Sequence, residues 1–223
     1  MNMYLIIILI LLIILRRKFK DYKIEWGTLL KKGLPQIDDR FGVYFITGRQ
    51  GSGKSFYAIK LLLLQDKSLC NKIKTNMKSI KIPGYEIEYF NKIQDIYFDT
   101  DEYCIYLLDE VSRKYDKNSR TDTQFYAWLN QSRKRHRIVI MITQEWKELP
   151  MWLRRPAKFM ITSVKVPILE LFGLTMTIVG DAENMVLDKD EMEWVCPPIK
   201  YIIYKRTLDI AQMYDTFEAV NEL

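Results

Sequence analysis

The feature that constrains this chain most is a complete phosphate-binding loop at residues 48–55, of the pattern G-x-x-x-x-G-K-S/T. Glycine allows the backbone to curl tightly, so that successive N–H groups can face one anion. Lys54 can reach the outer phosphates of a nucleotide, and the Ser55 hydroxyl can bind Mg²⁺. We therefore predict ATP and Mg²⁺ as cofactors. The predicted nucleotide-binding residues are Gly48, Arg49, Gln50, Gly51, Ser52, Gly53, Lys54 and Ser55.

The segments on both sides of this loop suit it. Residues 43–46 form an apolar run, as expected of a buried parallel strand. Residues 56–64 follow with a helical pattern, and the positive end of that helix dipole would face the phosphates. An ordinary glycine-rich turn is the alternative, and it would not require a strand before the loop and a helix after it.

A second apolar run, residues 103–108, ends in the adjacent acids Asp109 and Glu110. A carboxylate at the tip of this predicted strand can hold Mg²⁺ through water, opposite Ser55. Glu110 is placed to orient or polarise the attacking water, because phosphoryl transfer depends mainly on positioning and charge. The alternative interpretation is a strand end that merely meets solvent. The predicted metal ligands are Ser55 and Asp109.

The remaining patterns predict an α/β fold in which a parallel sheet is flanked by helices. Strands are predicted at 72–77, 137–144, 158–164 and 201–204, helices at 121–135 and 209–220, and a hairpin at 166–171 and 174–179. Residues 72–77 would place one more strand between the loop strand and the Asp109 strand. An adjacent acidic pair with an inserted strand distinguishes additional-strand ATP hydrolases from simple kinases. The hairpin would add a small C-terminal β extension.

The charge of the chain suggests a polyanionic partner. The net charge is +6 and the isoelectric point is near 9.0, which suits either nucleic acid or an anionic membrane surface. Cys70, Cys104 and Cys196 form no C-x-x-C pair, and the chain has a single histidine. We therefore expect reduced, buried thiols and no zinc site.

The amino-terminal segment is strongly apolar. Residues 4–15 are an unbroken apolar run, and basic residues follow at 16–20. This order fits a cleaved signal peptide badly, because the positive charge should precede the apolar run. The predicted organisation is a hydrophobic membrane anchor at 1–15, a basic juxtamembrane connector at 16–41 and an ATPase domain at 42–223.

A helix over residues 1–15 would span about 22 Å, less than the roughly 30 Å of a bilayer core. Snorkelling of Arg16 and Arg17, or a thinned bilayer, could close this gap. The positive-inside rule then predicts a single-pass protein with its ATPase domain in the cytoplasm. A hydrophobic arm buried on a partner subunit is the alternative.

Polar residues at predicted element ends complete the candidate site. Gln144 would end a strand at the carboxyl edge of the sheet, where an amide can contact both the attacking water and the γ-phosphate; an ordinary strand end is the alternative. The basic cluster 133–137 and Arg154 suggest an arginine finger, contacts to the DNA backbone, or a solvated helix end. The predicted catalytic residues are Glu110, Lys54, Gln144, Arg133, Arg135, Arg137 and Arg154.

The order of these motifs resembles the FtsK–HerA superfamily of DNA-pumping P-loop ATPases. The matching segments are 46–55, 107–110, 132–144 and 153–155. The resemblance implies that Asp109 and the loop bind ATP and Mg²⁺, and that Glu110 activates water. It also implies that Gln144 senses the γ-phosphate and that an arginine from 133–137 acts on a neighbouring subunit.

Within that superfamily, residues 42–223 look most like the zonula-occludens-toxin-like assembly ATPases of filamentous phages and like viral genome-packaging ATPases. In the phage proteins the membrane span usually follows the ATPase domain, whereas here the apolar segment comes first. The resemblance implies a homo-oligomeric ring that translocates DNA in phage assembly, extrusion or genome packaging, at a host membrane and with other virion assembly proteins. The alternatives are a nucleotide-dependent switch or scaffold, a kinase, and a plasmid or host ATPase.

Overall fold

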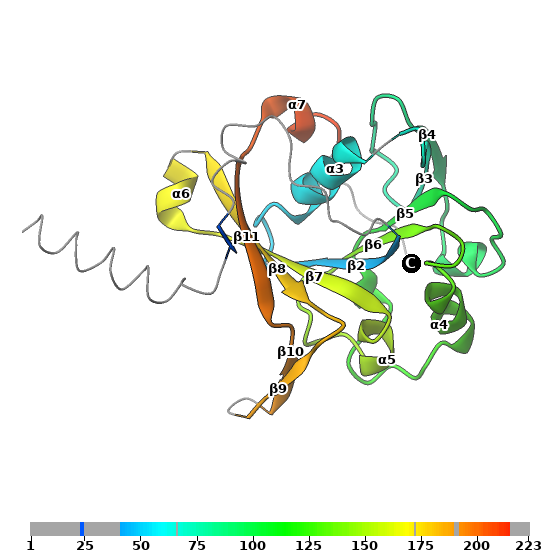
Figure 1. Cartoon of the computed structure of the whole chain (residues 1–223). Coiled ribbons are helices and arrows are strands. Elements are labelled where there is room, and N and C mark those ends of the chain that lie inside the picture. The colour runs from blue at the N-terminus through cyan, green and yellow to red at the C-terminus, as the bar shows by residue number, and fades with distance from the viewer. Residues whose placement is uncertain (1–22, 25–40, 66, 172, 190–191, 215–223) are drawn as a thin grey trace, which may run out of the picture.

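The computed structural model describes residues 23–24, 41–65, 67–171, 173–189 and 192–214 (Figure 1). The predicted membrane anchor at 1–15, most of the connector and the end of the predicted C-terminal helix lie outside these residues. None of the helices in the described ranges has the length and apolar content that a membrane crossing requires.

The described part of the chain contains both strands and helices. The strands are β1 (Lys23–Ile24), β2 (Gly42–Thr47), β3 (Lys72–Thr75), β4 (Glu86–Tyr89), β5 (Cys104–Leu108), β6 (Ile138–Ile142), β7 (Ala157–Val164), β8 (Leu174–Asp181), β9 (Val186–Asp188), β10 (Glu193–Val195) and β11 (Pro198–Lys205). The α-helices are α3 (Lys54–Leu64), α4 (Thr123–Asn130), α5 (Met151–Arg154), α6 (Pro167–Leu171) and α7 (Leu208–Ala211), and the 3₁₀ turns are η1 (Ile93–Ile96) and η2 (Val111–Arg113).

The central sheet has the strand order β1-β11-β8-β7-β2-β6-β5-β3-β4. The strands from β7 to β4 are parallel, β8 is antiparallel to both β7 and β11, and β1 is parallel to β11. The predicted α/β class is therefore confirmed, but the sheet is mixed: its strands from β7 to β4 are parallel, as predicted, and β8 is antiparallel. The predicted β extension is a continuation of this sheet through β8 and β11.

The strand of the phosphate loop lies in the middle of the sheet and is buried on both faces. Side chains alternate between the two faces of a strand. Tyr44 and Ile46 pack in the core under α3, whereas Val43 and Phe45 pack in the core that α4 and α5 cover (Figure 1). This three-layer arrangement explains why β2 is a continuous apolar run.

The inserted strand is β6. It lies between β2 and β5, with Phe45 beside Met141 and Leu107 beside Ile140. The prediction of an inserted strand is confirmed, but its assignment to residues 72–77 was wrong, because β3 lies on the far side of β5. Strand order depends on which way each crossover turns, and a local apolar pattern does not contain that information.

The predicted hairpin at 166–179 forms differently. Residues 167–171 are helix α6, and β8 pairs with β7 instead of with that segment. Pro167 lacks a backbone N–H, which ends a strand but suits the first turn of a helix. The hairpin therefore consists of β7 and β8, with α6 in the connection.

Helix α4 begins at Thr123, two residues after the predicted start, and ends early. The Asp122 carboxylate accepts a hydrogen bond from the backbone N–H of Phe125 at 3.0 Å. The helix ends at Asn130 instead of residue 135, and turns follow up to His136, whose φ of 52° is left-handed. These turns carry the basic cluster and lead directly into β6.

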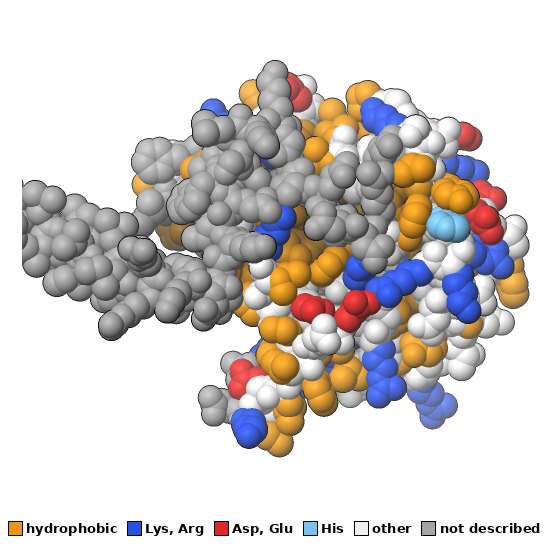
Figure 2. Space-filling view, viewed as in Figure 1, with side chains coloured by type: hydrophobic (Ala, Val, Ile, Leu, Met, Phe, Trp, Pro, Cys, Tyr) orange, Lys and Arg blue, Asp and Glu red, His pale blue; other side chains and the backbone are white. Residues whose placement is uncertain are grey.

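A small second sheet, formed by β9 and β10, projects from the body next to β8 and β11 (Figure 1). Its apolar side chains are unusually accessible: Val186 is 51% exposed, Leu187 43% and Trp194 43%. Apolar side chains are visible at this end of the molecule in Figure 2. Glu193, which pairs with Asp188 beside the turn of this hairpin, forms an ion pair with Lys147 of the body at 3.2 Å.

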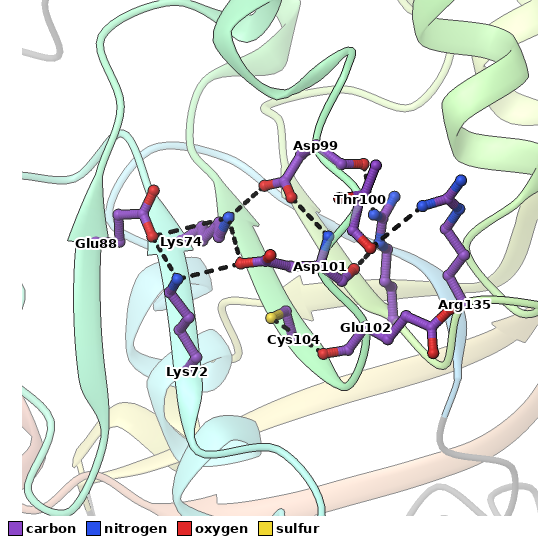
Figure 3. Close-up of polar contacts among 10 residues, drawn as sticks. Lys72, Lys74, Glu88, Asp99, Thr100, Asp101, Glu102, Cys104 and Arg135 are labelled. Carbon is purple, nitrogen blue, oxygen red and sulfur yellow. Dashed lines mark hydrogen bonds and ion pairs between the residues drawn. The ribbon is translucent and has the colours of Figure 1, made fainter.

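An ionic network closes the amino edge of β3 and β5 (Figure 3). Lys74 is buried and forms ion pairs with Asp99 and, at 2.8 Å, with Asp101. Lys72 contacts Asp101 at 3.1 Å and Glu88 at 2.7 Å. The carboxylates hold the pKa of Lys72 above its ordinary value. The network fixes the loop that precedes β5.

Arg137 also contacts the loop that precedes β5. Its side chain is completely buried at the amino end of β6. Its Nε donates to the carbonyl of Asp101 at 2.7 Å, and its Nη2 donates to the carbonyl of Asp99 at 2.6 Å. The guanidinium also lies over the rings of Tyr106 and Trp128. Arg137 therefore joins the loop to the core under α4.

Replacing Arg137 with Met should destabilise the fold by about 3 kcal/mol, because two buried carbonyls would lose charged donors. The measurement is urea unfolding. Lys134→Met, an exposed change in the same turn, should shift the free energy of unfolding by less than about 0.5 kcal/mol. Equal effects of the two changes would contradict the structural role of Arg137.

Candidate nucleotide-binding site

The phosphate loop leaves β2 at the carboxyl edge of the sheet. The N–H of Gly48 donates to the carbonyl of Gln144 at 3.0 Å, which ties the loop to the end of β6. Gly48, Gly51 and Gly53 have φ values of 143°, 72° and 95°, which side chains rarely adopt. A Cβ on Gly48 would lie 2.5 Å from the carbonyl oxygen of Ser163. The loop is therefore built on glycine for both conformation and space.

Helix α3 starts directly at Lys54, and its amino end offers an anion site. No side chain caps this end, and its first turn contains no acidic residue. The first N–H groups of a helix lack intrahelical acceptors and attract anions. The Lys54 ammonium donates to the carbonyl of Arg49 at 3.3 Å and so bends back over the loop. Backbone and side chain together create positive potential at one point.

The acidic pair lies within electrostatic reach of Lys54. Burial lowers the pKa of Lys54, and the negative charges of Asp109 and Glu110 oppose this shift. The two motifs therefore meet, although they come from β2 and β5, which are separated by β6. At about 4.8 Å per strand, that separation is about 10 Å, a distance that a lysine side chain and a nucleotide can bridge.

Burial raises the pKa of Asp109 to about 6, and the nearby charge of Glu110 adds to the shift. The Glu110 N–H, which donates to Asp109 Oδ1 at 2.9 Å, and the Lys54 charge act in the opposite direction. A buried carboxylate of this kind is stabilised by a further cation.

Asp109 and Ser55 are chemically suited to Mg²⁺, which prefers oxygen ligands. Among the described residues, no group of three or more His, Cys, Asp or Glu side chains could hold a metal. Mg²⁺ usually takes only one or two carboxylates from a protein and completes its shell with phosphate oxygens and water. One carboxylate and one hydroxyl fit an ion shared with bound phosphates.

Asn76 holds Asp109 in place, and the sequence patterns do not single it out. Asn76 follows β3, the neighbour of β5. Its Oδ1 accepts from the N–H of Asp109 at 2.8 Å, and its Nδ2 donates to the carbonyl of Asp109 at 3.1 Å. Both bonds come from one buried amide, so the backbone at the tip of β5 is fixed. A polar residue at the end of a predicted neighbouring strand was the only available signal.

Glu110 has a strained backbone and a local partner. Its φ of 53° is left-handed, an uncommon conformation for a residue other than glycine, and one that is often found at functional sites. Its carboxylate forms an ion pair with Arg113, three residues later in η2. This carboxylate is therefore held by a neighbour in the chain, while it still interacts with Lys54.

Gln144 lies where the sequence predicts, at the carboxyl end of β6 and between the loop strand and the Asp109 strand. Its side chain is exposed, and its backbone carbonyl receives the Gly48 N–H. Its assignment as a γ-phosphate sensor stays a prediction.

The four candidate arginines lie in two kinds of environment. Arg133 is exposed and pairs with Glu183, and Arg135 donates from Nη1 to the carbonyl of Thr100 at 3.2 Å. Both precede β6 and so lie at the amino edge of the sheet, opposite the phosphate loop. They stay candidates for contacts with a neighbouring subunit or DNA.

Arg137 and Arg154 lie inside the subunit, and their catalytic assignment stays a prediction. A finger must leave its own subunit, but Arg137 is completely buried and Arg154 is only 8% exposed. Arg154 lies over the ring of Trp146 at 5.8 Å, and burial lowers its pKa. Both guanidinium groups lie inside the subunit, where each packs against an aromatic ring. The local sequence does not identify these rings as neighbours of the two arginines.

The strand order, the inserted strand, the glycine loop and the acidic strand tip define the fold of a P-loop NTPase of the additional-strand class. No model of a protein family matches this sequence, and no curated protein matches it. Several solved structures are similar. One is the N-terminal domain of zonular occludens toxin from Neisseria meningitidis, with 18% identity and a TM-score of 0.56 over 79% of this chain and 100% of that chain.

Two further structures are similar at lower scores. The genome packaging NTPase B204 from Sulfolobus turreted icosahedral virus 2, solved with sulfate, has 13% identity and a TM-score of 0.48 over 72% of this chain and 97% of its own. The DNA-packaging ATPase B204 from Sulfolobus turreted icosahedral virus has 14% identity and a TM-score of 0.43, over 71% and 98%. The resemblance to zonula-occludens-toxin-like ATPases is thus confirmed at the level of the fold.

The pKa of Asp109 predicts a pH dependence of stability in Mg²⁺-free buffer. It is about 6 in the folded chain against an ordinary 3.8, so the folded state binds more protons between these values. The Asp109 carboxyl therefore stabilises the folded state fully below pH 3.8, its ordinary pKa. This stabilisation is lost as the pH rises through about 6, its pKa in the folded chain. Asp109→Asn should remove this loss.

The measurement is denaturant unfolding at about pH 4 and about pH 7. Glu148→Gln, at an exposed position, is the control and should leave the pH dependence of the wild type intact. A pH dependence that survives in Asp109→Asn would show that another group is responsible.

Proposed function

We propose that this chain is a Mg²⁺-dependent ATPase that moves DNA in phage assembly, extrusion or genome packaging. The observation that carries the proposal is the electrostatic interaction of Lys54 with both Asp109 and Glu110. It joins a phosphate-binding loop to an acidic pair, and ATP hydrolysis needs both. The fold shared with the zonular occludens toxin domain supports the same class of protein.

The proposed chemistry assigns each group a position along the triphosphate. The loop N–H groups and Lys54 hold the phosphates, and Mg²⁺, held by Ser55 and Asp109, would neutralise phosphate charge. Glu110 positions the attacking water once its carboxylate turns from Arg113, its partner in this structure. Gln144, which follows the strand between β2 and β5, contacts the γ-phosphate.

DNA binding and ring assembly are proposed from charge. The chain carries a net charge of +6, and Lys and Arg side chains gather on the side of the molecule around α4 and α5 (Figure 2). Arg133 and Lys134 are exposed, so they can meet DNA phosphates or the nucleotide of a neighbouring subunit. A finger that acts in trans requires a closed ring, because every subunit must have a neighbour.

We propose that residues 1–15 anchor this motor in a membrane as a single pass, with the ATPase domain on the cytoplasmic side. The apolar run and the basic residues that follow it support this proposal. Other phage or virion assembly proteins would then meet the motor at that membrane.

Replacing Glu110 with Gln should lower the ATP hydrolysis rate by about 100- to 1000-fold, because the amide cannot accept a proton from water. The ATP dissociation constant should change by less than about threefold, since the loop and Lys54 are untouched. Steady-state turnover and equilibrium binding measure the two effects. Glu145→Gln, an exposed neighbour of Gln144, should leave turnover unchanged. An unaltered rate in Glu110→Gln would remove the ATPase proposal.

DNA and self-association should both raise the turnover of the full chain in detergent. The measurement is ATPase rate per chain across protein concentration, with double-stranded, single-stranded or no DNA, and with Glu110→Gln as the inactive reference. A rate that rises with concentration and with DNA supports the ring motor. A rate indifferent to both would favour the nucleotide-dependent switch, for which the Glu110–Arg113 ion pair would act as the resting state.

A further inference from the structure

We propose that Arg206 is a second cation that binds the nucleotide, acting within the same subunit on the side of the phosphate loop away from the acidic pair. The proposal rests on nucleotide binding by the loop and adds the group that holds the α- and β-phosphates. Arg206 follows β11 and is more than 150 residues from the loop in sequence, so no local motif points to it.

Arg206 lies directly on the loop. Its Nη2 donates to the carbonyl of Ser52 at 3.2 Å, and its Nε donates to Thr175 Oγ1 at 2.7 Å. A Cβ placed on Gly53 would come within 3.2 Å of Nη2. The guanidinium is therefore packed against the residue that immediately precedes the phosphate-binding lysine.

The guanidinium keeps donors for a ligand. Arginine has five N–H groups, of which the bonds to Ser52 and Thr175 use two. Within the described part of the chain, Nη1 makes no hydrogen bond, and the side chain is partly exposed. Thr175 is buried and fixes Nε, so the remaining donors have a defined direction. A planar guanidinium held in this way suits phosphate oxygens.

The sheet order decides which phosphates are in reach. The γ-phosphate must point toward Asp109 and Glu110, which follow β5, on one side of β2. Arg206 comes from β11, on the other side of β2, beyond β7 and β8. It is therefore placed at the α- and β-phosphate end, which ATP and ADP share. Lys165 also lies near the loop, with its Nζ 3.7 Å from a Cβ built on Gly51. Unlike Arg206, it forms an ion pair with a carboxylate, that of Glu170, at 3.8 Å.

A group that contacts the part common to ATP and ADP should affect binding and not chemistry. Arg206→Gln should therefore raise the dissociation constants of ADP and ATP by the same factor, about tenfold, as expected for one charge-assisted hydrogen bond. The turnover number at saturating ATP should stay within about twofold of the wild type. The dependence of the dissociation constant on salt should also weaken, because one charge near the phosphates is gone.

Two variants complete the test on the full chain. Lys205→Gln removes the same charge at an exposed neighbouring position and should leave binding unchanged. Thr175→Val keeps the charge of Arg206 but removes the acceptor of Nε, so nucleotide binding should weaken by a smaller factor while its salt dependence stays as in the wild type. Thr175→Val also keeps the inference testable should Arg206→Gln fail to fold.

The outcomes separate this inference from the proposed function. Wild-type chain that binds neither ADP nor ATP would overturn the proposed ATPase. Wild-type chain that binds both, with Arg206→Gln equal to wild type, would overturn only the role of Arg206. A variant with a lower melting temperature, unchanged affinity and unchanged salt dependence would show that Arg206 merely braces the loop, and that result also overturns the inference.

Discussion

The candidate site depends on one electrostatic relation, the attraction between the Lys54 ammonium and the carboxylates of Asp109 and Glu110. All three groups are partly or largely buried, so each would be costly alone. Burial lowers the pKa of Lys54 and raises that of Asp109 to about 6. The groups are held there by backbone structure: the glycine loop on one side and the Asn76 amide on the other. A bound triphosphate would meet the Lys54 ammonium, and its cation would meet the carboxylates, in positions that the backbone has already fixed.

The carboxyl edge of the sheet carries the candidate site, and the amino edge carries the contacts that stabilise it. At the carboxyl edge lie the groups proposed to bind and cut ATP, with a strained backbone at Glu110 and glycines in left-handed conformations. At the amino edge, the pairs of Lys72 and Lys74 with their carboxylates and the buried guanidinium of Arg137 fasten the loop before β5. A fixed amino end sets the register of β5, and register decides where Asp109 emerges.

How far the sequence predicts the site varies by residue. The loop and the tip of β5 are contiguous patterns, so their positions could be predicted from spacing and alternation. Arginine cannot be assigned in this way, because its role depends on what surrounds it. Arg137 belongs to the same basic run as Arg133, yet one is buried against Trp128 and the other is exposed. Arg206 shows no pattern at all and reaches the loop only because β11 joins the sheet beside β8.

The sequence by itself determined the phosphate loop, the acidic pair and the alternation that buries β2 on both faces, because these follow from the chemistry and spacing of neighbouring residues. Tertiary structure alone decided that β6 and not β3 separates β2 from β5, that Asn76 clamps Asp109, and which arginines face solvent. The physical reason is that strand order and side-chain surroundings arise from contacts between residues distant in sequence. No local pattern carries the information that selects one such set of contacts over another.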